Sequence, residues 1–365
     1  MSRLGEFTCA QVSRTTVVPV AAMLCLAFCA APGPEAEQPK GDAWFEVPEG
    51  TPAHDHRLLS VDERDGWLEL VPDLVIEERR GTDDYSFGES APTIALDDAG
   101  RFFVYDPSNY RVAVFSSAGE FLYQFGSRGE GPGEFSGAIR RPIGFLDDRL
   151  FIYIGYRRLG FWTPEGEYIN GSEHRVTGTR VVPLYDGTVL SSAMLRDASI
   201  NQVAYTVARF AVTDNGLQET QRYARIPAGL QPNFAAEHTG EVYVSTIGPA
   251  TQVVAFDPDG SVRWVSRFHG SLGQFVMPAD LLLDGQGRIY VLPRLNRVKE
   301  LPPPVIRTVD VLSPDGKLLA AVKIPDLPIT IMWQQTRDQF VYGVQADPDT
   351  YEWQVVRYTL NLPFE

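Results

Sequence analysis

The chain has 365 residues, of which 32 are Lys or Arg and 47 are Asp or Glu, so its formal net charge at pH 7 is −15. Binding to a nucleic-acid backbone needs concentrated positive charge, and the acidic balance therefore argues against nucleic acid as a partner. The length exceeds that of most single domains, although closed repeats of β-strands form single domains of this size.

The first segment of the chain has the pattern of a signal peptide. Arg3 and Arg14 precede the run from Val17 to Ala31, which is apolar at nearly every position. A membrane-spanning helix needs about 20 apolar residues, and this run is shorter. We therefore predict that residues 1–31 are a signal peptide and that the protein is exported to the periplasm or the cell surface. An uncleaved membrane anchor is the alternative.

All three cysteines of the chain, Cys9, Cys25 and Cys29, lie in this leader. The rest of the chain therefore has no thiol for a disulfide or for catalysis. Cys29 follows the residues L-A-F, which resemble the lipobox of bacterial lipoproteins. A lipid on Cys29 is thus a second way in which the protein could be held at a membrane.

A polar turn that ends in glycine recurs along the remaining chain, between segments rich in apolar residues. The glycines of these turns are 44 to 56 residues apart and are Gly66, Gly119, Gly166, Gly216, Gly260 and Gly316. Short strands repeated every 40 to 50 residues or so are typical of propeller blades. We predict an all-β fold in which residues 67–365 form a six-bladed β-propeller and residues 32–66 form a linker or arm.

Blade one is the clearest in sequence, with four short segments of Val, Ile, Phe and Tyr between Thr93 and Phe125 that are joined by turn residues. This is the pattern of an antiparallel meander. The innermost strands of the other blades are predicted to begin near Ile143, Val181, Phe234, Ala279 and Ile329. Their second strands are predicted to begin near Phe151, Val189, Val242, Ile289 and Phe340.

The last blade lacks its outermost strand, because one further strand, residues 354–360, follows its second strand. The segment 67–78 precedes blade one, and we predict that it completes the C-terminal blade and so closes the ring. Deletion of residues 67–78 should then open the ring, whereas removal of residues 30–55 should have little effect.

The segment from Ile94 to Phe135 resembles an NHL repeat, and in particular the exported bacterial "6-bladed beta-propeller" proteins, many of which are lipoproteins. NHL-type propellers mostly serve as interaction platforms, while relatives with the same ring include lactonases and a peptide-amidating lyase. The resemblance therefore implies a six-bladed ring and is compatible with binding modules and enzymes alike.

Two polar segments of blade one are predicted to be structural. The glycine-rich loop from Gly126 to Phe135 is expected to cross between blades, with Phe135 packed at their interface, because a strand and not a helix follows it. Asp106, Asn109 and Arg111 could form a ligand site, but Asp and Asn usually bind their own turn backbone, and we expect that role here.

Ligands of propellers generally bind at the mouth of the channel where the segments that lead into the innermost strands converge. The candidate ligand-binding residues in these segments are Arg140, Arg141, Arg180, Asn233, Asp280 and Trp333. They would suit an anionic ligand such as a carboxylated sugar or a peptide. The alternative is that the arginines pair with neighbouring Asp and Glu.

No catalytic residue, metal site or cofactor is predicted. His54 and His56 lie in the expected arm, and the other three histidines have no zinc-site spacing. We predict a non-catalytic binding module for a small ligand or a protein partner. The alternatives are a lactonase-like hydrolase or lyase that acts at the channel mouth and a purely structural surface protein.

Overall fold

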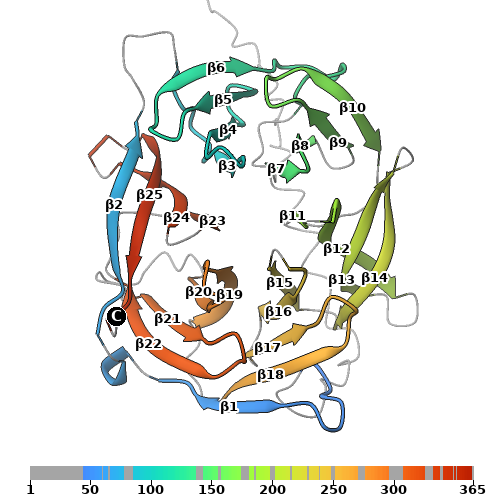
Figure 1. The fold of residues 1–365 in the computed structure, drawn as a ribbon, viewed down its shortest axis with the longest axis vertical. Helices are drawn as coiled ribbons and strands as arrows, with labels where there is room; N and C mark the ends of the chain where they lie inside the picture. The colour runs from blue at the N-terminus through green and yellow to red at the C-terminus, as the bar shows by residue number, and fades with distance from the viewer. Residues whose placement is uncertain are drawn as a thin grey trace, which may run out of the picture. The chain divides into compact units, whose positions relative to one another are not determined.

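The structure is a computed structural model, and it describes residues 44–59, 61–64, 66–77, 85–136, 143–154, 158–173, 181–184, 186–197, 202–213, 216–227, 230–237, 239–247, 251–269, 276–295, 307–324, 332–337, 340–347, 349–350 and 352–363. The described residues from 44 onward belong to one compact unit, residues 41–365. Six small antiparallel meanders form a ring around a central axis (Figure 1), where propellers have their channel. The predicted all-β six-bladed propeller is confirmed.

Each blade starts at its innermost strand, next to the channel, and proceeds outward. Blade one consists of β3 (Thr93–Leu96), β4 (Phe102–Asp106), β5 (Arg111–Phe115) and β6 (Phe121–Phe125). Blade two consists of β7 (Ile143–Leu146), β8 (Arg149–Ile154), β9 (Arg158–Trp162) and β10 (Tyr168–Glu173). Blade three consists of β11 (Val181–Pro183), β12 (Thr188–Asp197), β13 (Gln202–Thr213) and β14 (Gly216–Ile226).

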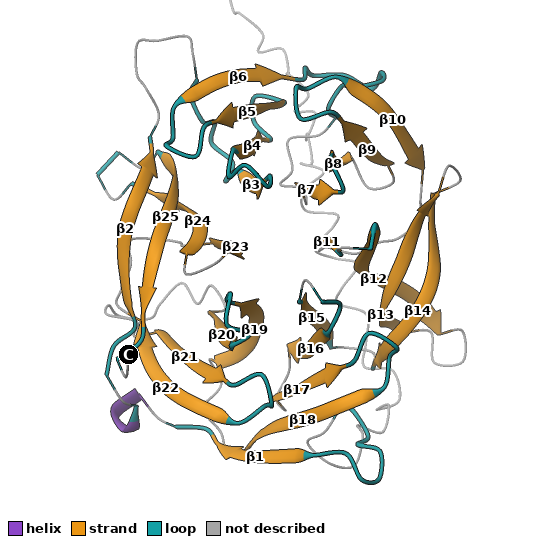
Figure 2. Cartoon of the chain, viewed as in Figure 1, coloured by secondary structure: helices purple, strands orange, loops and turns teal. Residues whose placement is uncertain are grey.

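Blades four and six each include a strand from the N-terminal part of the chain. Blade four consists of β15 (Gln231–Ala236), β16 (Val242–Ile247), β17 (Thr251–Phe256), β18 (Val262–His269) and β1 (Ala53–Arg57). Blade five consists of β19 (Val276–Leu283), β20 (Ile289–Leu295), β21 (Arg307–Leu312) and β22 (Leu318–Ile324). Blade six consists of β23 (Met332–Arg337), β24 (Phe340–Ala346), β25 (Trp353–Asn361) and β2 (Glu69–Ile76). The helical part of the described chain is one short 3-10 turn, η2 (Val61–Glu63), drawn in purple in Figure 2.

The turn glycines that marked the repeat adopt backbone angles that favour glycine. All six have positive φ, for example +87° at Gly260 and +85° at Gly316. Gly260 closes its turn by donating its N–H to the Asp257 carbonyl at 2.8 Å. Because residues with a Cβ are strained in this region, glycine is the residue that such a turn favours.

Six clusters of buried apolar side chains hold the ring together, one at each contact between neighbouring blades. Large aromatic side chains lie in them, for example Trp162 between blades one and two and Phe256 between blades three and four. Both faces of each blade are therefore apolar, which explains why strands such as β4 read as continuous apolar runs.

The glycine-rich loop after β6 has the predicted structural role. Phe135 is fully buried between blades one and two, with its ring 5.2 Å from that of Tyr105 and 5.3 Å from that of Trp162. Its backbone N–H donates to the Ser127 carbonyl at 2.8 Å, which folds the loop back on itself. Gly126 has a φ of +96°, and a Cβ there would lie 2.1 Å from the Phe135 ring.

We expect Gly126→Ala to lower the free energy of unfolding by about 1–3 kcal/mol through backbone strain alone. The clash between the new methyl group and the Phe135 ring should add a further loss. Gly50→Ala is the matched control, since Gly50 has a φ of +83° but no atom within 4 Å of the added Cβ. Urea unfolding of the two variants would separate the two effects. Equal losses would show that the Phe135 contact is easily relieved.

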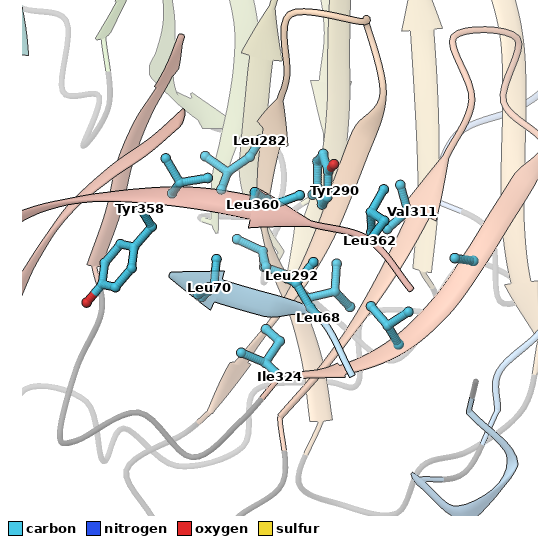
Figure 3. Close-up of a cluster of buried hydrophobic side chains, with 14 of the residues drawn as sticks. Leu68, Leu70, Leu282, Tyr290, Leu292, Val311, Ile324, Tyr358, Leu360 and Leu362 are labelled. Atoms are coloured by element: carbon cyan, nitrogen blue, oxygen red, sulfur yellow. The ribbon is translucent and has the colours of Figure 1, made fainter. Parts of the chain in front are cut away.

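The N-terminal strand β2 closes the ring, as predicted. It pairs antiparallel with β25 from Glu69↔Asn361 to Ile76↔Val355, which makes it the fourth strand of blade six. Figure 3 shows Leu68 and Leu70 packed with Leu360 of β25 and with side chains of blade five. The first and last parts of the chain therefore share one sheet.

The segment before β2 differs from the dispensable arm expected from the sequence. Trp44 is 7% exposed and belongs to the cluster between blades three and four. The strand β1 pairs in parallel with β18, from Ala53↔Val265 to Arg57↔His269. We call residues 44–76 the N-terminal strap, because they contact blades four, five and six in turn, and removing residues up to 55 would strip Trp44 from the apolar cluster.

Within the described residues, no helix has the length and apolar character required to cross a membrane. The expected signal peptide, residues 1–31, and the lipid attachment site Cys29 lie outside the described residues.

Candidate ligand site at the start of the innermost strands

The innermost strands of the six blades, β3, β7, β11, β15, β19 and β23, surround the channel (Figure 1). Because neighbouring strands in a blade are antiparallel, the start of an innermost strand lies at the same end of the blade as the end of the second strand and the start of the third. We call the mouth at this end the first mouth. It is where the sequence predicts a ligand.

Three of the predicted ligand-binding residues lie on consecutive innermost strands. Asn233 is in β15, Asp280 in β19 and Trp333 in β23, and β19 contacts both of the other strands. Arg140, Arg141 and Arg180 lie outside the described residues. The position of the predicted cationic part of the site therefore stays a prediction.

Asn233 is the predicted site residue whose side chain the structure describes. It is half-buried, and its Nδ2 is buried without a hydrogen-bond partner among the described residues. Asn233 lies directly opposite Ser245 of β16, whose Oγ is likewise buried and unpartnered. Directly opposed residues in an antiparallel pair have Cβ atoms about 5 Å apart. Two hydrogen-bonding groups without partners therefore lie side by side, one on the innermost strand of blade four and one on its second strand.

The next polar pair of blade four faces the opposite way. Thr246 of β16 and Gln252 of β17 lie one position beyond the Ser245↔Val253 pair, toward the first mouth. Thr246 Oγ1 and Gln252 Nε2 are both buried without a hydrogen-bond partner among the described residues. Gln252 Oε1 accepts the backbone N–H of Phe45 at 3.1 Å, so this side of the blade is contacted by the N-terminal strap. Side chains alternate along a strand, which separates this pair from Asn233 and Ser245.

The polar turn of blade one is held by internal contacts, as predicted. Asp106 is 1% exposed, and its Oδ1 accepts the backbone N–H groups of Ser108 at 3.1 Å and Asn109 at 3.2 Å. Arg111 lies 3.8 Å from the Asp106 carboxylate and donates to the Gln124 side chain at 2.6 Å. These contacts stabilise the turn and leave its carboxylate engaged with the protein.

The residues around Asn233 and Ser245 make an uncharged, hydrogen-bonding environment. Tyr243 lies two positions before Ser245 on the same face, is 1% exposed, and its pKa is raised by burial, so it is neutral at physiological pH. Asn, Ser, Thr and Gln side chains carry no charge at any physiological pH. The described polar side chains Asn233 and Ser245 can therefore bind a ligand by uncharged hydrogen bonds.

Within the described ranges, no three His, Cys, Asp or Glu side chains are grouped as a metal site would require. His54 and His56, expected in a free arm, lie in β1 with their rings stacked at 6.3 Å. His56 Nε2 contacts the Gly316 carbonyl at 3.2 Å, and burial lowers the pKa of His56. His269 Nε2 lies 2.7 Å from Asp55 Oδ1 on the exposed side of the same strand pair.

Sequence reasoning missed Ser245, Thr246 and Gln252. The signal was present, because S-T interrupts the otherwise apolar strand V-Y-V-S-T-I, and Gln252 is the second residue of the strand T-Q-V-V-A-F. Polar residues inside strands that are buried on both faces need hydrogen-bond partners, and such positions can be found from the sequence once the blades are recognised.

Comparison with known proteins supports the fold. The sequence model of a family described as DUF5128, "6-bladed beta-propeller", matches residues 82–152, which cover blade one and most of the first two strands of blade two. No curated protein matches the chain.

Solved structures with the same fold have low sequence identity. A DUF4221 family member from Bacteroides vulgatus has a TM-score of 0.54 and 10% identity, with 81% of this chain and 98% of that chain covered. A Bacteroides fragilis protein, whose name classes it provisionally as exported, has a TM-score of 0.52 and 11% identity, with 85% and 99% covered. A gluconolactonase from Xanthomonas campestris is more distant, with a TM-score of 0.44, 15% identity, and 80% and 98% covered. At these identities, the two Bacteroides structures support the fold alone.

Proposed function

We propose that this protein is an exported β-propeller that binds a small polar ligand or a protein partner at the first mouth of its channel, without catalysing a reaction. The observation that carries the proposal is Asn233, which lies on an innermost strand, is half-buried, and has a side-chain nitrogen with no partner among the described residues. A buried donor without an acceptor is costly to the fold, so a ligand that supplies the acceptor would bind there with a gain in stability.

The predicted residues Asp280 and Trp333 support the same location, because their strands follow β15 in order around the channel. Arg140, Arg141 and Arg180 enter the proposal as sequence predictions, and they would favour a ligand that carries a carboxylate. Propellers commonly use this end of the ring because loops from every blade can reach one ligand there.

The proposal of export has its own support, the apolar run from Val17 to Ala31. Intact mass and N-terminal sequencing of the protein made by a bacterial host would test it. Cleavage near residue 31 is the expected result, a lipid on Cys29 would indicate the lipoprotein alternative, and a full-length product in the cytoplasm would contradict export.

Binding is tested by thermal melts of the protein against sugars, sugar acids and short peptides, together with capture of protein partners on the immobilised chain. A ligand that raises the melting temperature, and whose effect is lost when Arg141 and Arg180 are both replaced by Ala, supports the proposed site. Turnover of a lactone or ester by the purified protein would instead favour the hydrolase alternative.

A further inference from the structure

The unused hydrogen-bonding groups of the described chain are concentrated on one blade. Eight buried side-chain atoms lack a partner among the described residues, and four of them belong to blade four, on Asn233, Ser245, Thr246 and Gln252. The other four are on Trp44, Arg111, Arg209 and Tyr223, in the N-terminal strap, blade one and blade three. Some buried hydroxyl groups do have partners: Thr206 Oγ1 of blade three donates to the Ala224 carbonyl at 3.1 Å, and Ser266 Oγ of β18 donates to the Gly316 carbonyl at 2.5 Å. Blade four therefore departs from a general rule of folded proteins at one end of its sheet.

Asn233 and Ser245 lie on the face of blade four that packs against blade five. Ser245 is two residues from Tyr243, and Asn233 is two residues from Ala235. Tyr243 and Ala235 belong to the cluster that contains Leu281 of β19. Because side chains two apart along a strand share a face, Asn233 and Ser245 face β19, the strand that carries Asp280.

The pair also differs in depth. Ser245 is 1% exposed, whereas Asn233 is half-buried. A molecule in the channel would therefore meet Asn233 first and Ser245 behind it. The unmatched atom of Asn233 is an amide nitrogen, which only donates, and the Ser245 hydroxyl can donate as well.

We infer that Asn233 and Ser245 form a subsite, between blades four and five at the first mouth, for a ligand that presents oxygen acceptors from a carboxylate or a carbonyl group. This inference rests on the proposed function and adds to it the chemical class of the ligand and the residue Ser245. The ligand oxygen accepts from Asn233 Nδ2 and from Ser245 Oγ. The subsite lies beside β19, so the ligand also lies next to the strand of Asp280.

The chain supplies a matched control in Thr246. It follows Ser245 in β16, is fully buried, and has an unpartnered hydroxyl group. It lies on the opposite face, with Val244 and Val254 of the cluster between blades three and four. Thr246→Val and Ser245→Ala each remove one buried unpartnered hydroxyl group, and in the ligand-free protein each should leave the melting temperature unchanged or raise it.

The test is isothermal calorimetry of the full chain, of these two variants and of a third, Asn233→Asp. The four probes are glucuronate, glucose, triglycine and triglycinamide. We expect Ser245→Ala to raise Kd about tenfold, the loss of one good hydrogen bond, and Thr246→Val to leave Kd unchanged. Asn233→Asp, which replaces the donor by an anionic acceptor, should weaken binding of glucuronate and triglycine more than binding of glucose and triglycinamide, which lack a carboxylate.

The probes separate the two sources of the acceptor oxygen. Binding of the two acids alone identifies a carboxylate, and binding of triglycinamide as well identifies carbonyl oxygens. If the wild-type chain binds a probe and neither Ser245→Ala nor Asn233→Asp alters Kd, the subsite is wrong while the binding module survives. If the wild-type chain binds none of the four probes, the ligand class is wrong, and partner capture still tests the proposed function.

Discussion

Deletion of residues 67–78 is expected to abolish cooperative folding of the ring. Blade six would lose its outermost strand β2, and two of the six apolar clusters would lose members: Leu68 and Leu70 at the contact with blade five, and Ile76 at the contact with blade one. Burial of such side chains contributes about 1.5–3 kcal/mol each. Three of them together approach the net stability of about 5–15 kcal/mol that is typical of a whole protein.

Circular dichroism melts and limited proteolysis would measure this effect. A chain that lacks only residues 1–40 is the control, because residues 41–365 form a compact unit of their own. We expect the control to melt in one sharp transition and the deletion variant to be cleaved rapidly. Adding a peptide of residues 67–78 to the deletion variant should restore part of the transition, since β2 is held by a strand ladder. A deletion variant that melts like the control would show that the ring closes without β2.

Arg64→Ala is expected to lower the free energy of unfolding by about 3–5 kcal/mol, the cost of leaving a buried charge without its partner. The Arg64 side chain is 1% exposed, and its NH1 lies 2.6 Å from Oδ1 of Asp310 in β21. Arg64 also donates to the carbonyl groups of Leu59 and Val309, each at 3.3 Å. This one side chain therefore fastens the N-terminal strap to blade five.

The loss should depend on pH in a defined direction. Burial raises the pKa of Asp310 above its ordinary value of 3.8, and Arg64 opposes that rise. A group whose pKa is raised on folding adds stability below its unfolded pKa, and that contribution is lost as the pH rises through the folded pKa. Without Arg64 the pKa of Asp310 rises further, so the deficit of the variant is greatest at neutral pH and shrinks as Asp310 becomes protonated.

Urea unfolding at neutral and at acidic pH would measure both parts of this prediction. The double variant Arg64→Met with Asp310→Leu is the control, because replacing a buried ion pair by apolar groups of similar volume is often neutral. It should recover most of the stability that Arg64→Ala loses. A single variant with wild-type stability at neutral pH would show that the ion pair does not hold the strap.

The architecture could be predicted because blade-forming sequence is local. Val242, Ile289 and Phe340, predicted as starts of second strands, are the first residues of β16, β20 and β24. Glycines such as Gly119 marked the outer turns, since each needs a positive φ that few other residues tolerate. The closure by β2 followed from counting strands, because a blade with an open edge needs a partner.

The path of the N-terminal strap could not be predicted in the same way. Trp44 and Arg64 contact blades that lie far from them in the sequence, so no local pattern reveals their partners. Strand β1 is a further difficulty, because A-H-D-H-R has little β-propensity, and its pairing with β18 comes from tertiary context. The polar character of the segment suggested an arm, while a few buried side chains hold it against the ring.

The strand positions of Asn233, Asp280 and Trp333 could be predicted, whereas their role as a ligand site stays a prediction. Asn233 lies near the start of an innermost strand, a position that the repeat determines. Ser245 escaped attention because a serine at the end of a strand is common, and its significance depends on having no partner once the blades pack. That property exists only in the folded chain.

Hydrogen–deuterium exchange of the full chain, with and without the probe that binds most tightly, would locate the ligand site. We expect slower exchange in β15, β16 and β19, the strands that carry Asn233, Ser245 and Asp280, and no change in the outer strands β6 and β10. Protection confined to outer strands, or to blades other than four and five, would contradict a ligand site between blades four and five.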